Sequence, residues 1–326
     1  MKHPGRPLPP VPAGKSGWPW VDISGDVPLL RADGSPWPKL VVVTPSFNQG
    51  EFIEETLRSV LAQGYPELEY VVIDGGSTDR TREVLERYSP WITRWQSQPD
   101  GGQYDAVNVG FAGATADLMA WINSDDVYAP GAFATVGEVF SCFQAVDWVT
   151  SLQPMALNAR GRRTWCRRLG GFAREGFRRG EYVVGAGRFS SAWIPQESTF
   201  WRRSLWERAG GRVDAKLQMA GDFELWSRFY ESSELFGVDA PLAGFRRHRQ
   251  QKTSRNLPLY RAEAADVFAR HGGAADGFGR ALARKWLSRL PAQLRRPMPA
   301  LGLGYRAEVI TKSRGGDRWI LQTRPV

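Results

Sequence analysis

Cysteine, histidine and long apolar runs are scarce in this chain of 326 residues. Its two cysteines, Cys142 and Cys166, make no disulfide framework, and with only three histidines the chain offers no cluster typical of a zinc site. No stretch approaches the roughly 18 consecutive apolar residues of a membrane span. The first 38 residues are rich in Pro and Gly and lack the apolar segment of a signal peptide. We therefore expect a cytoplasmic protein.

Acidic residues are outnumbered, since 43 basic and 34 acidic residues leave a net charge of +9. Nucleic acid, phosphate and anionic lipid would all be attracted by this excess. Neither a zinc-finger spacing nor an RNP-type aromatic motif accompanies it, so we expect no nucleic-acid partner. The basic residues gather in two segments, 160–179 and 278–296.

Strand and helix patterns alternate along the first half of the chain. Buried strands are predicted at residues 40–43, 69–73, 91–96 and 118–122. Amphipathic helices are predicted at residues 51–63, 82–88 and 103–110. This alternation is typical of an α/β fold with a mostly parallel, Rossmann-like sheet flanked by helices.

The second half is less regular. Residues 160–192 mix arginine, glycine and aromatics, which predicts a long mobile loop. Partial helices are predicted at 195–210 and 220–230, a helical extension from 265 to 296, and a short hairpin within 308–323.

Two adjacent carboxylates, Asp125 and Asp126, follow the apolar strand at 118–122. Ligands of open α/β sheets bind at the carboxyl ends of strands. Mg²⁺ or Mn²⁺ bridges one or two carboxylates to substrate phosphates at such sites. The alternative is an aspartate that caps the next helix.

Three other loops at predicted strand ends carry polar groups. Thr44, Pro45, Ser46 and Asn48 follow the first strand and offer small donors and acceptors to a base or ribose. Asp74 follows the second strand and either accepts from a nucleotide or caps the Gly75–Gly76–Ser77 turn. Asp105 and Asn108 lie one helical turn apart, so they share a face.

Five blocks in order resemble the motifs of glycosyltransferase family 2. They are residues 42–49 (VVTPSFNQ), 72–79 (VIDGGSTD), 99–108 (PDGGQYDAVN), 121–126 (WINSDD), and 195–203 (PQESTFWRR) with 221–226 (GDFELW). The resemblance covers about two-thirds of the chain and implies the GT-A fold. The resemblance does not cover the Pro/Gly-rich arm (1–38), which its composition predicts to be draped on the domain or disordered, or the basic helical C-terminal extension (259–326). Between them lies the implied catalytic domain (39–258). Within the catalytic domain, residues 39–145 form the nucleotide-sugar half and residues 146–258 the acceptor half.

Carried over to this chain, the resemblance implies a set of nucleotide-binding residues. They are Thr44, Pro45, Ser46, Asn48, Asp74, Gly102, Asp105, Asn108, Ser124 and Asp125. Ser124-Asp125-Asp126 stands where the family has Asp-X-Asp, so Asp126 is implied as the ligand of a divalent metal, Mn²⁺ or Mg²⁺. Asp125 would hold ribose or reach the metal through water. The serine at the first position removes one carboxylate from the motif.

Asp222 matches the family's catalytic base, which takes the proton of the acceptor hydroxyl in an inverting displacement. An N-cap role for the following helix is the alternative, and Glu224 is the second candidate for the base. Gln196 and Glu197 are implied on the acceptor side.

His248 lies among arginines in the segment 244–253 (GFRRHRQQKT). It either completes the metal shell, as in some GT-A enzymes, or faces phosphate or solvent. Arg246, Arg247, Arg249 and Lys252 are candidates for a diphosphate clamp.

The C-terminal extension contains a basic amphipathic pattern, with Phe278, Leu282, Trp286 and Leu290 at a spacing of four. Such a helix either lies on an anionic bilayer or packs its Leu/Trp face on the catalytic domain, and we expect packing. A processive synthase is disfavoured because the chain has no Gln-X-X-Arg-Trp motif after Asp222.

The sequence thus predicts an inverting, metal-dependent glycosyltransferase that moves one sugar from a nucleoside diphosphate sugar, a UDP-sugar first of all, to a saccharide or lipid-linked acceptor. Bacterial surface polysaccharide or glycolipid synthesis is the setting that the family implies. Two alternatives stay open: a nucleotidyltransferase, and a binding module for sugar nucleotides that has no turnover.

Overall fold

A computed structural model describes residues 7–21, 27–183, 193–316 and 318–326. The elements described in the first half match the predicted alternation within a few residues, except for those at residues 89–91, 127–128 and 132–142, which were not predicted. The elements of this half are β1 (Leu40–Ser46), α1 (Ile53–Leu61), β2 (Leu68–Asp74), α2 (Thr81–Tyr88), η1 (Ser89–Trp91), β3 (Arg94–Ser97), α3 (Gln103–Phe111), β4 (Leu118–Trp121), β5 (Val127–Tyr128) and α4 (Ala132–Cys142).

The second half of the chain adds strands that periodicity did not predict. Its elements are β6 (Trp148–Ser151), β7 (Met155–Asn158), β8 (Arg163–Cys166), α5 (Arg174–Arg178), η2 (Gln196–Ser198), β9 (Phe200–Arg202), α6 (Arg203–Arg208), α7 (Gly221–Ser232), β10 (Leu235–Val238), β11 (Ala243–Arg247), α8 (Lys252–Arg255), α9 (Leu257–Arg270), α10 (Phe278–Leu287), α11 (Ala292–Arg295), η3 (Pro299–Leu301), β12 (Arg306–Lys312) and β13 (Trp319–Pro325).

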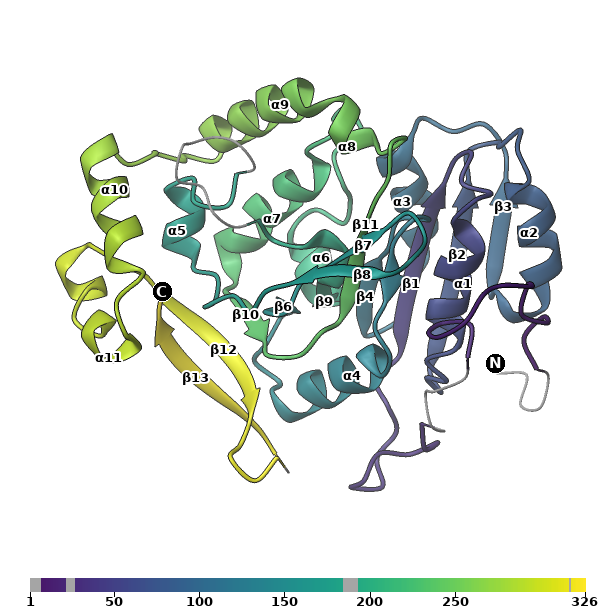
Figure 1. Ribbon diagram of the computed structural model, residues 1–326, viewed down its shortest axis with the longest axis horizontal. Helices are drawn as coiled ribbons and strands as arrows, with labels where there is room; N and C mark the ends of the chain where they lie inside the picture. The colour runs from purple at the N-terminus through teal and green to yellow at the C-terminus, as the bar shows by residue number, and fades with distance from the viewer. Residues whose placement is uncertain (1–6, 22–26, 184–192, 317) are drawn as a thin grey trace.

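The central sheet has nine strands in the order β13-β12-β10-β6-β9-β4-β1-β2-β3. β1 pairs in parallel with both β2 and β4, and Ser46 lies opposite Asp74 at their carboxyl ends. β9 runs antiparallel between β4 and β6. The predicted α/β fold with a mostly parallel sheet is therefore confirmed (Figure 1).

Apolar cores fill both faces of this sheet. Along β1, Val41 and Val43 pack into one core and Val42 into the other, as the alternation of a strand requires. The first core includes side chains of α3 and α7, and the second includes side chains of α1, α2 and α4. Because both faces are covered, the central strands β1, β2 and β4 carry long apolar runs.

A second sheet has four strands in the order β5-β11-β7-β8. β5 pairs antiparallel with β11, with Val127 opposite Gly244. This pairing joins segments more than a hundred residues apart. It brings Asp125 and Asp126, which precede β5, next to the end of β11 and His248.

The described part of the N-terminal arm lies on the domain. Trp18 Nε1 donates to the Tyr128 carbonyl at 2.7 Å, and Arg58 Nη1 of α1 donates to the Pro9 carbonyl at 2.8 Å. Trp20 is buried. Residues 1–38 were expected to be either draped on the domain or disordered, and their described part is draped on the domain.

The prediction of one long loop over residues 160–192 was wrong for its described part. Residues 163–166 form β8 and residues 174–178 form α5, while residues 184–192 lie outside the described ranges. Leu169 and Phe172 also pack against the core. Short strands anchored by distant partners carry little periodic signal, so the arginine-rich composition was misleading.

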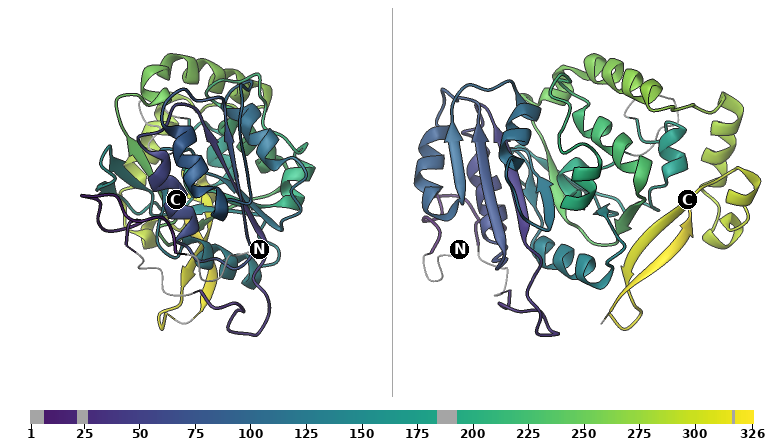
Figure 2. Two further views of the ribbon diagram at one scale, coloured as in Figure 1. Left: turned by 90° about the vertical axis from the view of Figure 1, so that its right-hand side faces the viewer. Right: turned by 180° about the vertical axis from the view of Figure 1, so that it is seen from behind.

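The C-terminal extension differs from expectation in two ways. Its hairpin is longer than predicted and joins the central sheet, because β12 pairs in parallel with β10. The expected packing of the Leu/Trp face of α10 is only partial: Phe278 and Trp286 are each 62% exposed, Leu282 is half-buried, and Arg284 is the buried residue of that helix. None of the helices in the described ranges is both long and apolar enough for a membrane span. Residues 7–21 of the arm and the helices α10 and α11 of the extension lie at opposite ends of the molecule (Figure 2).

Candidate active site

The loop after β1 is built from small polar groups. The Thr44 hydroxyl is buried 3.0 Å from the Tyr70 hydroxyl, and Pro45 and Ser46 complete the strand. Ser46 Oγ is buried and has no hydrogen-bond partner in the described ranges. Asn48 adopts a positive φ of 52° and accepts from the Thr78 amide at 2.9 Å. The loop is thereby fixed to the turn that follows β2.

Asp74 is fully buried at the end of β2. Its carboxylate accepts from the Ser77 amide at 2.9 Å, from Ser77 Oγ at 2.5 Å and from Ser97 Oγ at 2.6 Å. The capping role considered for this residue is therefore present. Its predicted contact with the nucleotide stays a prediction.

The loop before α3 contains a further carboxylate that sequence reasoning missed. Asp105 Oδ2 accepts from the Gly101 amide at 2.9 Å, and Asp100 Oδ1 accepts from the Gly102 amide at 2.8 Å. Burial raises the pKa of Asp100, and the charges of Asp105 and Asp74 raise it further. Three carboxylates thus gather where the base and ribose were expected.

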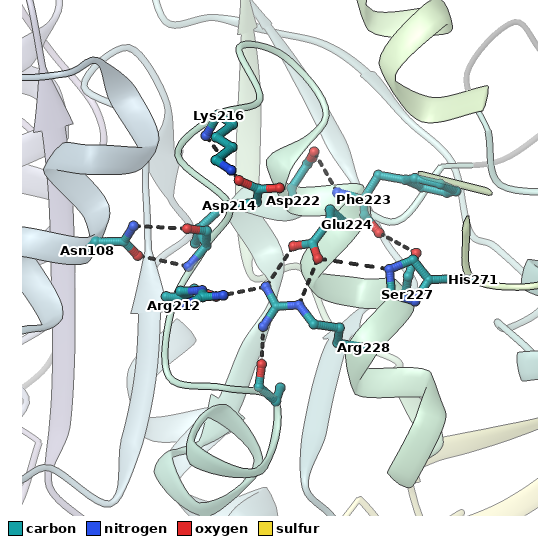
Figure 3. A network of polar contacts seen from close by, with 12 residues as sticks. Asn108, Arg212, Asp214, Lys216, Asp222, Phe223, Glu224, Ser227, Arg228 and His271 are labelled. Atoms are coloured by element: carbon teal, nitrogen blue, oxygen red, sulfur yellow. Dashed lines mark hydrogen bonds and ion pairs between the residues drawn. The ribbon is translucent and has the colours of Figure 1, made fainter. Parts of the chain in front are cut away.

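Asn108 has another partner. Its amide nitrogen donates to the Val213 carbonyl at 2.9 Å, and its amide oxygen accepts from the Val213 amide at 2.8 Å (Figure 3). Both ends of this side chain join α3 to the segment before α7. Asp105 and Asn108, predicted to act together on a nucleotide, therefore have separate local roles in the structure.

Asp125 meets His248 at the carboxyl end of β4. Asp125 Oδ2 lies 2.9 Å from His248 Nε2, and His248 Nδ1 is buried without a partner among the residues described. The Phe52 ring packs on the imidazole with 4.4 Å between ring centroids. The sequence placed His248 in a metal shell with Asp126, whereas its observed contact is with Asp125.

Asp126, the next residue along the chain from Asp125, is 1% exposed. Its Oδ1 accepts from the Arg246 amide at 2.8 Å, while its Oδ2 is buried without a partner in the described part of the chain. Burial raises the pKa of Asp126 well above its usual range, and the charges of Asp125 and Glu197 add to the rise. Ser124 is buried beside it.

Arg246 is not a diphosphate clamp, which corrects the sequence expectation. The side chain is fully buried, pairs with Glu55 at 3.2 Å and donates from Nε to the Asp125 carbonyl at 2.6 Å. It therefore holds the backbone of the Asp125–Asp126 loop. Lys252 lies over the Tyr104 ring, and burial lowers its pKa.

A series of hydrogen-bonded side-chain amides connects residues from the two halves of the chain. Gln103 Nε2 donates to Asn123 Oδ1 at 2.7 Å, and Asn123 Nδ2 donates to Gln196 Oε1 at 3.3 Å. Gln196 Nε2 donates to the Trp121 carbonyl at 2.8 Å. Gln103 and Asn123 were not among the predicted site residues, although both lie inside the quoted motifs.

Glu197 and Asp222 extend the line of carboxylates toward the acceptor half. Burial raises the pKa of Asp222 to about 6, against hydrogen bonds that lower it. Burial also raises the pKa of Glu197 to about 7, and the charge of Asp222 contributes. Asp222 is the second residue of α7 and accepts from the Phe223 amide at 2.8 Å. A group with a pKa near 6 is ionised at neutral pH and still able to accept a proton.

Glu224, the second candidate for the base, faces elsewhere. Its carboxylate pairs with Arg228 Nε at 2.8 Å and Nη2 at 2.7 Å, and His271 lies 3.9 Å away. Figure 3 shows Glu224 turned toward Arg228 and His271, with the Asp222 carboxylate directed away from that cluster. Glu224 is thus held in an ion pair with Arg228.

The donor groups fit a divalent cation. In the described ranges, no three His, Cys, Asp or Glu side chains are arranged to hold an ion by themselves. The buried, unpartnered Asp126 Oδ2 and the Asp125–His248 pair nevertheless provide an oxygen and nitrogen set suited to Mn²⁺ or Mg²⁺. Mg²⁺ is usually bound by one or two carboxylates together with substrate phosphates, so an incomplete set is sufficient.

Comparisons with known proteins match the chain to glycosyltransferases. The model of glycosyl transferase family 2 matches residues 41–141. An uncharacterized glycosyltransferase of Mycobacterium tuberculosis is 42% identical over 106 residues, which are 32% of this chain and 40% of that protein. TuaG of Bacillus subtilis, provisionally assigned to teichuronic acid biosynthesis, is 36% identical over 94 residues, 28% of this chain and 37% of TuaG. The chain thus spans well under half of the length of these relatives.

Solved structures extend the likeness beyond the nucleotide half. S. aureus TarS 1-349 in complex with UDP-GlcNAc has a TM-score of 0.56 and 20% identity, over 77% of this chain and 73% of that one. A mannosyltransferase of Pyrobaculum calidifontis in complex with GDP-Man and Mn²⁺ has a TM-score of 0.51 and 19% identity, over 82% of this chain and 75% of that one. The fold is the GT-A fold, and residues 41–141 match glycosyl transferase family 2.

Proposed function

We propose that this chain transfers a single sugar from a nucleoside diphosphate sugar to an acceptor hydroxyl, with inversion at the anomeric carbon. The observation that carries the proposal is the line of carboxylates from Asp125 to Asp222. It begins at the carboxyl end of β4, where nucleotides bind in this class of sheet, and ends at a carboxylate with a pKa of about 6.

Asp222 is the base in this proposal. Its carboxylate would take the proton of the acceptor hydroxyl while the oxygen attacks the anomeric carbon. A single displacement inverts that carbon. Glu197, whose pKa is raised by burial and by the charge of Asp222, would orient the acceptor together with Gln196.

Asp125 and His248 are the metal ligands in this proposal, with Asp126 behind them. The family resemblance implied Asp126 and His248 in that role, but the 2.9 Å contact joins His248 to Asp125. Two ligands bound at about 2.1 Å and at right angles are about 3 Å apart, so this pair has the spacing of neighbouring metal ligands. A bound Mn²⁺ or Mg²⁺ would neutralise the diphosphate as it leaves.

The donor half would be completed by the loops after β1, β2 and β3. Thr44, Ser46, Asn48, Asp74, Asp100 and Asp105 surround the expected position of base and ribose. UDP is the preferred nucleotide of the proposal, supported by the UDP-GlcNAc complex of TarS. A saccharide or lipid-linked acceptor in surface polysaccharide synthesis is supported by the likeness to TuaG. The expected cytoplasmic location is kept as part of the proposal.

A screen of nucleotide sugars with Mn²⁺ tests this function, with release of the nucleoside diphosphate as the readout. We expect release from one UDP-sugar and loss of that release in Asp125→Asn. Binding without release from any donor or with any acceptor offered would favour the alternative of a binding module. Release of pyrophosphate from a nucleoside triphosphate would instead favour a nucleotidyltransferase.

A further inference from the structure

The C-terminal segment 277–305 presents large apolar side chains to solvent. Phe278 and Trp286 are each 62% exposed, Leu294 57% and Leu301 64%. These four residues belong to α10, α11 and η3, which are consecutive in the chain and lie together at one end of the molecule (Figure 1). Isolated exposed leucines are ordinary, but four large apolar side chains within 25 residues suggest an interaction surface.

A buried arginine fixes which face of α10 points outward. Arg284 is 7% exposed, bonds Asp276 at 2.5 Å and Glu181 at 2.8 Å, and lies over the Tyr305 ring. Phe278, Leu282 and Trp286 follow one another at a spacing of four, on the side of the helix opposite Arg284. The helix is therefore held to the domain by its charged residue and shows its apolar stripe to solvent.

The charge around this stripe has one sign. Residues 277–305 contain six basic residues and no acidic residue. Arg284 and Arg280 both pair with Asp276, and the other four are Lys285, Arg289, Arg295 and Arg296. The Arg289 guanidinium lies over the Trp286 ring, 4.7 Å from the ring centroid. A cation and an aromatic ring therefore occupy the same part of the surface. Phe, Trp and Leu beside Arg and Lys are the composition of helices that lie in the interface of an anionic bilayer.

We propose that the surface formed by α10, α11 and η3 docks on an anionic lipid bilayer. Apolar side chains would enter the headgroup region, while the arginines contact lipid phosphates. A second copy of this chain is a poorer occupant, because a symmetric contact would bring two all-basic surfaces together. The proposal does not depend on the transfer reaction.

Sedimentation of the full chain with vesicles tests the proposal. We expect binding to vesicles of phosphatidylcholine containing about one-third phosphatidylglycerol, no binding to pure phosphatidylcholine, and weakening as salt rises. The Phe278→Ala/Trp286→Ala variant should bind at least about tenfold more weakly, since it removes two anchoring rings. The control Leu29→Ala/Leu30→Ala removes exposed leucines from the N-terminal arm and should bind as the parent does.

Two charge-reversal variants distinguish binding to anionic lipid from nonspecific adsorption. Arg289→Glu should lower binding to anionic vesicles, whereas Arg82→Glu, on the exposed face of α2, should leave it unchanged. Unaltered melting temperatures would show that each variant is folded. We expect this result because the substituted side chains are highly exposed. A full chain that ignores anionic vesicles at low salt, or equal losses in the controls, would overturn the proposal. So would an apolar surface occupied by a second copy, seen as a dimer that the Phe278→Ala/Trp286→Ala variant cannot form.

Discussion

At the scale of single residues, the site depends on carboxylates that burial makes weaker acids. Asp126, Glu197 and Asp222 all have raised pKa values, with burial as the largest cause. Each of them is less stable as an anion in the fold than in water. A cation, a proton or a substrate hydroxyl relieves that cost, so the site favours binding such groups.

Asp222→Asn should lower the rate of transfer by roughly 10²–10⁴, because the amide cannot accept a proton. Since the pKa of Asp222 is about 6, kcat/KM of the parent should rise with pH up to about 6 and then level off. The variant should lack that rise. Steady-state rates across pH check both points, and near-parental transfer by the variant would exclude Asp222 as the base.

Glu197→Gln should stabilise the metal-free protein at high pH and leave it unchanged at low pH. The pKa of Glu197 is raised in the fold to about 7, so the folded state binds the extra proton and loses stability as pH rises toward and through 7. A shift of this size corresponds to at most about 3 kcal/mol. Urea unfolding at pH 4 and pH 8, in the presence of a chelator, measures the difference. An equal effect at both pH values would contradict the assignment.

The sequence supplied the candidate site residues but not the partners of their side chains. Asp125, Asp222 and His248 follow from motifs, since each lies in a local sequence block. That His248 contacts Asp125 instead of Asp126, and that Arg246 is buried, depends on the pairing of β5 with β11 across 117 residues. Local sequence carries no signal for such a contact.

At the scale of elements, the start of α7 is held by a polar network around Arg228. Arg228 donates to the carbonyls of Ala209 and Arg212 and pairs with Glu224, while Asn108 bonds both backbone groups of Val213. This network fixes the segment 209–214 that leads to Asp222 (Figure 3).

Arg228→Met should cost about 3 kcal/mol of stability, because it leaves the buried Glu224 carboxylate without its partner. Changing both residues, Arg228→Met/Glu224→Leu, should cost less than the single change. The matched control Arg82→Met breaks an exposed pair with Glu86 and should cost less than about 1 kcal/mol. Denaturant unfolding gives all three values, and a single variant no worse than the control would argue against the network.

Element prediction succeeded where local pattern and packing agree. β1, β2 and β4 are buried on both faces, so their apolar runs identify them. β9 has three residues and begins where η2 ends, and β8 is mostly exposed. Such strands form because a distant neighbour pairs with them, which explains why they were missed.

At the scale of the whole molecule, the C-terminal hairpin completes the central sheet. Val309 and Ile310 of β12 are fully buried on opposite faces, one in each core. The sequence indicated a hairpin near residues 308–323 but placed it in a separate extension. Its pairing with β10 joins the last segment of the chain to the catalytic domain.

Ile310→Ala should therefore cost about 2–5 kcal/mol, as expected for a core position. Leu321→Ala, on the exposed side of β13, should change stability by less than about 1 kcal/mol. Calorimetric or denaturant unfolding of the full chain compares the two. Equal effects would show that the hairpin does not share the core of the domain.

The central claim is that a divalent cation at Asp125 and His248 couples to a nucleoside diphosphate, and calorimetric titration of UDP with and without Mn²⁺ tests it most directly. Mn²⁺ should strengthen UDP binding by about tenfold or more in the parent protein, since it bridges carboxylate and diphosphate. That enhancement should disappear in Asp125→Asn and persist in Asp222→Asn, which retains the donor half. UDP binding that is absent, or that Mn²⁺ leaves unchanged in the parent, would contradict the account.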